Sequence, residues 1–270
     1  GTGDPELVLL HGGSQNAHTW DTVAMALERP LVAIDLPGHG HSDGPGDRPE
    51  GQLNAEGIAK DAAVAIAALA PDARGVVGMS MGGLTTIALT KVAPHLVRKA
   101  VLVDVTPGVT PEKSKQISDF INGPPSFANL DDLLARTIQF NPTRTVSSLR
   151  RGILHNALQR EDGTWVWRWA RWREGIGGGL PSEEARRRAV DRPADAPLFG
   201  ELWDIVSEIK VPVLLARGML PQSVVGDDDE AELLRRLPDV KVVRFDNAGH
   251  SIQGDMPVEL AREIEAFVFS

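Results

Sequence analysis

Residues 75–83 read Gly-Val-Val-Gly-Met-Ser-Met-Gly-Gly and join a short apolar run to a serine flanked by glycines. The run Gly75–Met79 has the composition of a strand buried on both faces, and a helical pattern begins directly after Ser80. The serine therefore stands in the pattern Gly-x-Ser-x-Gly on a tight turn between strand and helix. Gly78 and Gly82 leave room for such a turn, which lifts the serine hydroxyl clear of the sheet. These residues predict a nucleophilic serine.

The rest of the chain alternates between short apolar runs and helical patterns. This alternation is typical of a parallel sheet with helices on both faces. We predict strands over Leu7–Leu10, Leu31–Ile34, Gly75–Met79, Ala100–Val105, Val211–Ala216 and Val240–Phe245. We predict helices over Ile58–Leu69, Met81–Val92, Glu230–Leu237 and Val258–Val268.

Residues 107–208 interrupt the alternation without a clear strand. Helical patterns occur near Leu130–Gln139 and Val146–Leu158, and a structureless loop of this length would be unusual. We therefore predict a helical cap over 107–208, inserted into a core made of residues 1–106 and 209–270. The cap holds Trp165, Trp167, Trp169 and Trp172, which suggest an apolar cavity against the core, and Gly175–Gly179 is a candidate hinge.

Composition and charge exclude several classes of function. The 270 residues include no cysteine, which excludes disulfides, thiolate metal sites and a cysteine nucleophile. The net charge of −9 disfavours nucleic acid as a partner. No apolar run approaches the ~20 residues that span a bilayer, and no leader is visible. We expect a cytoplasmic protein without a membrane partner; the oligomeric state stays open.

A nucleophilic serine requires a base and hydrogen-bond donors for an oxyanion. The predicted base is His250, which lies in a glycine-containing loop between the last predicted strand and the last predicted helix. The Met81 N–H begins a helix and can stabilise an oxyanion. In the sequence His11-Gly-Gly-Ser14, Gly13 offers the second predicted N–H. We expect His11 to order this turn through hydrogen bonds rather than to transfer protons.

Together these motifs resemble the α/β-hydrolase fold, from Leu7 to Phe269. Residues 35–43, Asp-Leu-Pro-Gly-His-Gly-His-Ser-Asp, look like the loop after that family's fourth strand. The resemblance implies a mostly parallel twisted sheet, a cap after the sixth family strand, and no cofactor. Only six residues precede Leu7, so no counterpart of the family's first hairpin is expected. We expect His39 and His41 to shape a turn, and we expect no metal site.

The resemblance leaves two places for the catalytic acid. The family usually carries an aspartate just after its seventh strand, but here no carboxylate follows that strand until Asp227 and Asp228. Some members carry the acid after the sixth strand, where Asp104 ends an apolar run. We favour Asp104, because a carboxylate buried there requires a partner such as a histidine. Asp227 and Asp228 can instead be solvated residues that begin a helix.

The predicted activity follows from the resemblance. It implies acyl transfer to Ser80, with His250 as the base and Asp104 orienting it, on a small to medium apolar carboxylic ester or lactone. A carbon–carbon bond hydrolase of a vinylogous diketone, or a cofactor-free haloperoxidase or perhydrolase, would use the same serine and histidine. A non-catalytic ligand receptor on this scaffold is the alternative from a different class. Dehalogenases and epoxide hydrolases are disfavoured because they require a carboxylate in place of Ser80.

Overall fold

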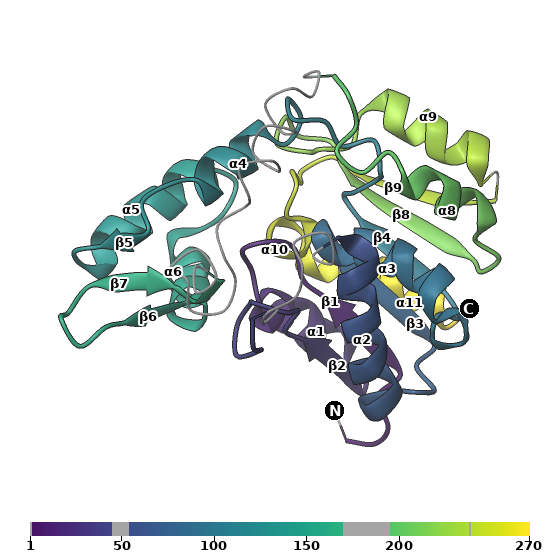
Figure 1. Ribbon diagram of the computed structural model, residues 1–270, viewed down its shortest axis with the longest axis horizontal. Helices are drawn as coiled ribbons and strands as arrows, with labels where there is room; N and C mark the ends of the chain where they lie inside the picture. Colours follow the sequence, from purple (N-terminus) through teal and green to yellow (C-terminus); the bar gives the residue numbers. More distant parts are fainter. Residues whose placement is uncertain (1, 45–53, 170–194, 238) are drawn as a thin grey trace.

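The computed structural model describes residues 2–44, 54–169, 195–237 and 239–270, and a six-stranded parallel sheet forms its centre (Figure 1). The strand order is β2-β1-β3-β4-β8-β9, and every neighbouring pair is parallel. The strands are β1 (Leu7–Leu10), β2 (Leu31–Ile34), β3 (Gly75–Met79), β4 (Ala100–Val103), β8 (Val213–Gly218) and β9 (Lys241–Phe245). The predicted fold class is confirmed.

Helices cover both faces of this sheet (Figure 1). Val8 and Leu10 of β1 join one apolar cluster, and Leu7 and Leu9 join the other. Burial on both faces explains why the strand shows no polar alternation. The first cluster includes residues of α2 (Ala55–Leu69), α3 (Met81–Val92), α8 (Leu202–Glu208) and α9 (Asp227–Arg236). The second includes residues of α1 (Asp21–Leu27), α10 (Ile252–Asp255) and α11 (Pro257–Val268).

The inserted segment forms a layer of its own beside the main sheet (Figure 1). It contains a three-stranded antiparallel sheet in the order β5-β7-β6. Its elements are α4 (Lys115–Ile121), β5 (Ser126–Phe127), α5 (Leu130–Phe140), α6 (Val146–Asn156), β6 (Ala157–Gln159) and β7 (Trp165–Trp167). Two 3-10 helices, η1 (Ala17–Trp20) and η3 (Pro94–Leu96), belong to the core. None of the helices in the described segments combines the length and apolar character that crossing a bilayer requires.

The described part of this layer is not purely helical, in contrast to the predicted cap over 107–208. We expected a helix through Leu158, but α6 ends at Asn156 and Ala157 adopts an extended conformation. Residues from Ala157 onward pair with β7, whose Trp-Val-Trp sequence has strong strand propensity. Trp172 and the candidate hinge Gly175–Gly179 lie outside the described residues.

The predicted cap boundary at residue 208 also differs from the packing. Leu202, Ile205 and Val206 of α8 are buried in the core cluster that includes α2 and α3. Helix α8 therefore covers the main sheet, because its apolar face completes the core beside α3. The predicted insertion thus ends in a helix that packs with the core.

Gly78 and Gly82 allow β1, β3 and α3 to approach one another closely around Ser80. A Cβ atom on Gly82 would clash with the carbonyl oxygen of Leu10 in β1, and one on Gly78 would clash with the Gly82 carbonyl. These contacts are with backbone, which cannot move aside as a flexible side chain can. The packing of α3 against β1 and β3 therefore depends on the absence of side chains at both positions.

We expect Gly82→Ala to lower the free energy of unfolding by about 2–4 kcal/mol, because the clash exceeds the gain in helix propensity. Gly152→Ala is the matched control, since it lies within α6 with nothing within 4 Å of the added methyl group. The control should raise stability by about 0.5–1 kcal/mol. Urea unfolding followed by circular dichroism measures both. Equal stability of the two variants would contradict this account of the turn.

Candidate active site

Ser80 connects β3 to α3 in a backbone conformation that is rare for residues other than glycine. Its φ is 51° and its ψ is −118°. The Ser80 N–H donates to the Val103 carbonyl oxygen (3.2 Å), and the Ser80 carbonyl accepts from the N–H groups of Gly83 (2.8 Å) and Leu84 (3.0 Å). Such a conformation costs of order 1–3 kcal/mol and persists only where its surroundings hold it. Here β4 and the first turn of α3 hold it.

His250 and Asp104 are joined by a hydrogen bond, although 146 positions separate them in the sequence. His250 Nδ1 lies 2.9 Å from Asp104 Oδ2. The Asp104 side chain is 0% exposed and the His250 side chain is 12% exposed. Because a carboxylate only accepts, Nδ1 carries a proton in this pair, and in the neutral imidazole Nε2 is the nitrogen with the lone pair.

Three further donors contact the Asp104 carboxylate. Its Oδ1 accepts from the Gly218 N–H (2.9 Å) and the Ser223 hydroxyl (2.6 Å), and its Oδ2 accepts from the Val224 N–H (3.1 Å). All three donors come from the end of β8 and the loop that follows it. They compensate for the loss of solvent around a buried charge.

Asp227 and Asp228, the alternative acids, lie at the start of α9 and contact other partners. Asp227, whose side chain is 95% exposed, pairs with Arg217 (2.7 Å). Asp228, whose side chain is 78% exposed, pairs with Lys113 (3.2 Å). Neither forms a hydrogen bond with His250 among the described residues. The structure therefore brings Asp104, and not these two residues, to the imidazole.

A cavity of about 690 Å³ connects these groups, and both the core and the inserted layer line it. Ser80, His250, Gly13 and Met81 all contribute to its wall. Apolar side chains of the inserted layer also line it, namely Ile117, Phe120, Ile121, Leu149, Ile153 and Trp167. The serine and the histidine thus face one cavity, but no hydrogen bond joins Ser80 Oγ to His250 in the described structure.

The loop after β1 lies directly against the serine. A Cβ atom on Gly12 would stand 3.2 Å from Ser80 Cβ, so a side chain there would crowd the nucleophile. Gly13, the next residue, and Met81, at the N-terminus of α3, line the same cavity. Within the described residues, neither of their N–H groups donates a hydrogen bond to the protein. Both donors are therefore available to a ligand.

His11 and His39 are structural residues of this loop. The Leu36 N–H donates to His11 Nε2 (2.9 Å), and the Ser14 N–H donates to His39 Nε2 (3.1 Å). Each Nδ1 therefore carries the proton and lies next to a carbonyl oxygen, that of Gly12 for His11 and that of Pro37 for His39. Burial, reinforced by the neighbouring His39, lowers the pKa of His11 to about 3. These neutral rings join the two loops.

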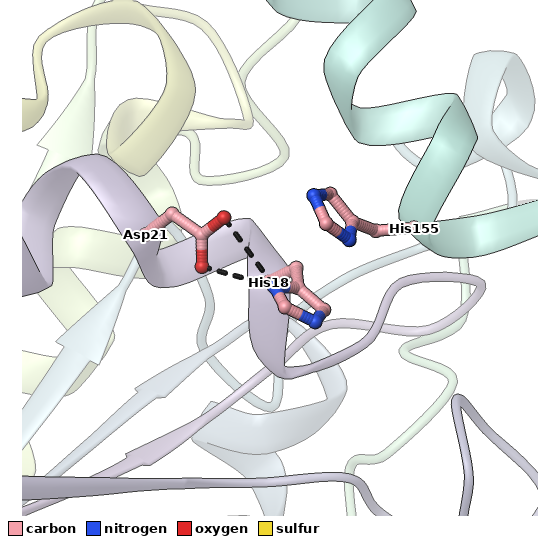
Figure 2. A group of neighbouring side chains, drawn as sticks. All are labelled: His18, Asp21 and His155. Atoms are coloured by element: carbon pink, nitrogen blue, oxygen red, sulfur yellow. Dashed lines mark hydrogen bonds and ion pairs between the residues drawn. The ribbon is translucent and has the colours of Figure 1, made fainter.

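A second polar group, which the sequence analysis missed, lies where α6 faces η1 and α1 (Figure 2). His18 Nδ1 is 3.2 Å from Asp21 Oδ1, and the His18 and His155 rings stack with centroids 3.9 Å apart and planes 19° apart. One ligand atom of each residue lies within 4.8 Å of the others, and these are ligand types that zinc accepts. The near-parallel rings direct their lone pairs along separate planes, so one ring must turn before a shared ion could bind.

The comparisons with known proteins agree with the fold. A family model described as "Alpha/beta hydrolase family" matches residues 7–263. The chain is 39% identical to Esterase Rv0045c of Mycobacterium tuberculosis over 96% of this chain and 82% of that protein. A crystal structure of that esterase has a TM-score of 0.76 at 37% identity, with 98% of this chain and 84% of that chain covered.

A second relative is more distant. The chain is 32% identical to a pimeloyl-[acyl-carrier protein] methyl ester esterase of Nitrosospira multiformis, over 91% of this chain and 88% of that protein. The match again runs across both the core and the inserted layer, because it covers nearly the whole length of each protein.

Because His11 is buried and neutral, we expect the free energy of unfolding to decrease in acid. Its folded pKa of about 3 is below the ordinary 6.5, so the unfolded chain binds the proton more tightly. His11 therefore does not lower the free energy of unfolding above pH 6.5, and it lowers this free energy increasingly as the pH falls from 6.5 toward 3. Between pH 7 and pH 5 the loss amounts to about 2 kcal/mol. Urea unfolding of wild type and His11→Asn at both pH values measures it.

The His11→Asn variant keeps every other titrating group, so it is the reference against which the contribution of His11 in the wild type is measured. It should be less stable than wild type at pH 7, and its stability should fall less between pH 7 and pH 5. An identical fall in the two proteins would show that His11 does not remain neutral on folding.

Proposed function

The chain belongs to the alpha/beta hydrolase family, and on this premise we propose that it hydrolyses carboxylic esters through an acyl-enzyme on Ser80. The observation that carries the proposal is the hydrogen bond between His250 and the buried Asp104, in a cavity that Ser80 also lines. The similar proteins from M. tuberculosis and N. multiformis are named esterases, which supports an ester as the substrate class.

Acylation begins when His250 Nε2 takes the proton of the Ser80 hydroxyl. Ser80 Oγ then bonds to the ester carbonyl carbon, and the carbonyl electron pair moves onto oxygen. The N–H groups of Gly13 and Met81 donate to this oxyanion, and the positive end of α3 adds to its stabilisation. The intermediate collapses as the bond to the alcohol oxygen breaks, and His250 gives its proton to that oxygen.

Deacylation repeats the sequence with water as the nucleophile. His250 takes a proton from water, the hydroxide oxygen bonds to the acyl carbon, and Ser80 Oγ leaves with the proton that His250 returns. Asp104 accepts from Nδ1 throughout, which fixes the tautomer and stabilises the imidazolium that forms in each half-reaction. Gly218, Ser223 and Val224 hold the Asp104 carboxylate in position through their hydrogen bonds to it.

The dimensions of the cavity support a small to medium substrate. Its volume of about 690 Å³ lies within the ordinary range for small-molecule sites. Apolar residues of α4 and α6 line the same cavity as Ser80, which suits an aliphatic or aromatic acyl or alcohol part. A lactone fits the same mechanism, because its ring oxygen is the leaving group.

Ser80→Ala should lower ester turnover by on the order of 10⁴-fold or more, because no other group forms the acyl-enzyme. A screen of p-nitrophenyl esters and lactones measures turnover, and a fluorophosphonate probe detects the nucleophile directly. Wild type should be labelled by the probe and Ser80→Ala should not. An unlabelled but folded wild type would favour the ligand-receptor alternative instead.

Asp104→Asn should lower kcat by roughly 10³–10⁴-fold, because an amide NH₂ facing Nδ1 favours the wrong imidazole tautomer. The double variant Asp227→Asn with Asp228→Asn is the control and should retain wild-type kcat. Circular dichroism and thermal unfolding confirm that each variant is folded before its kinetics are compared. If the double variant is crippled while Asp104→Asn is active, the acid belongs to the start of α9.

A further inference from the structure

Arg144 lines the cavity beside the loop that carries His250. It lies just before α6, and its guanidinium packs against α10, with Cζ 2.8 Å from where a Cβ atom on Gly254 would stand. Gly254 comes four positions after His250 in the chain. A cationic group of the inserted layer therefore reaches the histidine side of the cavity.

The guanidinium of Arg144 has few partners in the described structure. Its Nη2 donates to the Ser148 hydroxyl (2.7 Å), and this is the one hydrogen bond it makes to the described residues. Its Nε is buried and lacks an acceptor there. A buried donor without an acceptor costs about 1–3 kcal/mol, so the buried Nε–H of Arg144 requires a physical explanation.

The neighbouring carboxylate does not supply that acceptor. Asp255 lies close enough to influence Arg144, but its Oδ1 accepts from the Thr143 hydroxyl (2.9 Å) and its Oδ2 accepts from the Gly249 N–H (2.9 Å). No ion pair joins Arg144 to Asp255 or to another carboxylate of the described segments. Burial is the main cause that lowers the pKa of Arg144, and a bound anion would offset this effect by stabilising the charged guanidinium.

A second cation lies on the same side of the cavity. Arg151 of α6 also lines the wall, donates to the Thr22 hydroxyl (3.0 Å), and forms no ion pair among the described residues. Ser148 and Arg151 are three positions apart and share one face of α6, whereas Leu149 and Ile153 on the adjoining face join the apolar cluster of the inserted layer. The cavity wall therefore combines an apolar surface with two arginines that form no ion pair within the described segments, in a chain whose net charge is −9.

We propose that Arg144 binds a carboxylate of the substrate, so that the ester this chain cleaves also carries a free acid group at one end of an apolar chain. A guanidinium presents its N–H groups in a planar fork that matches the two oxygens of a carboxylate. Nε–H is buried and has no acceptor in the part of the chain that the structure describes, and the Ser148 hydroxyl accepts from Nη2 and holds the group in place. This inference rests on the proposed ester hydrolysis and specifies its substrate class.

Two matched substrate pairs test the proposal. Monomethyl adipate and methyl hexanoate differ by a carboxylate on the acyl part, whereas the acetate ester of 6-hydroxyhexanoic acid and hexyl acetate differ by one on the alcohol part. Wild type should prefer the acidic member of at least one pair. Arg144→Gln should lower kcat/KM for that member by about 10–100-fold more than kcat/KM for its neutral partner. NMR detection of the released products measures all four rates.

Two further variants serve as controls. Arg150→Gln removes the same charge from an exposed residue of α6 that does not line the cavity, and it should leave all four rates unchanged. Arg144→Lys keeps the charge but loses the planar fork, and it should give an intermediate kcat/KM for the acidic ester. Equal losses on acidic and neutral esters in Arg144→Gln would assign Arg144 a structural role and overturn the proposal. An unchanged preference would also overturn it.

Direct binding separates this proposal from the proposed function. If wild type cleaves neither member of either pair, the assignment of these esters as substrates fails, but the carboxylate site can still be measured by calorimetric titration with adipate. Adipate should bind wild type and Arg150→Gln with the same Kd, and its Kd should rise by about 10–100-fold in Arg144→Gln. The same Kd in all three proteins would show that Arg144 is no carboxylate site.

Discussion

The buried carboxylate of Asp104 is the constraint around which the carboxyl ends of the strands are arranged. A charge without solvent is costly, so each of its contacts must be a donor held in place. The donors come from the end of β8, from the loop after it, and from the loop after β9. The Asp104 side chain therefore holds the loop after β8 and the loop after β9, both of which are far from Asp104 in the sequence. The same contacts keep His250 at the cavity.

This constraint also explains the loop after β8, where the family's usual acid has no counterpart. The loop supplies the Ser223 hydroxyl and the Val224 N–H to the carboxylate of Asp104, which directly follows β4. Its far end is held by Arg217, which donates to the Val225 carbonyl oxygen (3.1 Å) and to Glu230 (2.7 Å). The exposed Asp227 completes that ion-pair network. The acid therefore follows β4, its donors follow β8, and the histidine that it contacts follows β9.

Most of the sheet and the catalytic motifs were predictable because the cause is local in the sequence. Strands β1, β2 and β3 begin and end where the apolar runs do. Strands β1 and β3 are fully buried, which leaves no polar residue within them, and the half-buried edge strand β2 is equally apolar. The ends of β4 and β8 were wrong by two residues for specific reasons. Strand β4 stops at Val103 because Asp104 takes a φ of 46° to reach its donors. Strand β8 continues through Arg217, whose charge is buried against Glu230.

What the sequence could not reveal depends on contacts between distant segments. No periodicity indicates that His155 stacks on His18 or that Arg144 packs against Gly254, because the position of α6 relative to the core decides both. The short strands β6 and β7 were missed for a related reason. They are three residues long and are stabilised by pairing with each other rather than by a pattern within either.

The position of α6 matters for the chemistry because hydrogen bonds connect it to the loop that holds Gly13. Asn156 Nδ2 donates to the Ser14 carbonyl oxygen (2.7 Å), and Asn16 Nδ2 donates to the His155 carbonyl oxygen (3.0 Å). On the core side, the Ser14 N–H donates to His39. The residue after Gly13 is thus held between the core and the layer that lines the substrate cavity. A substrate that displaces α6 must move or break these bonds, so the fit of the substrate and the position of the Gly13 N–H are physically linked.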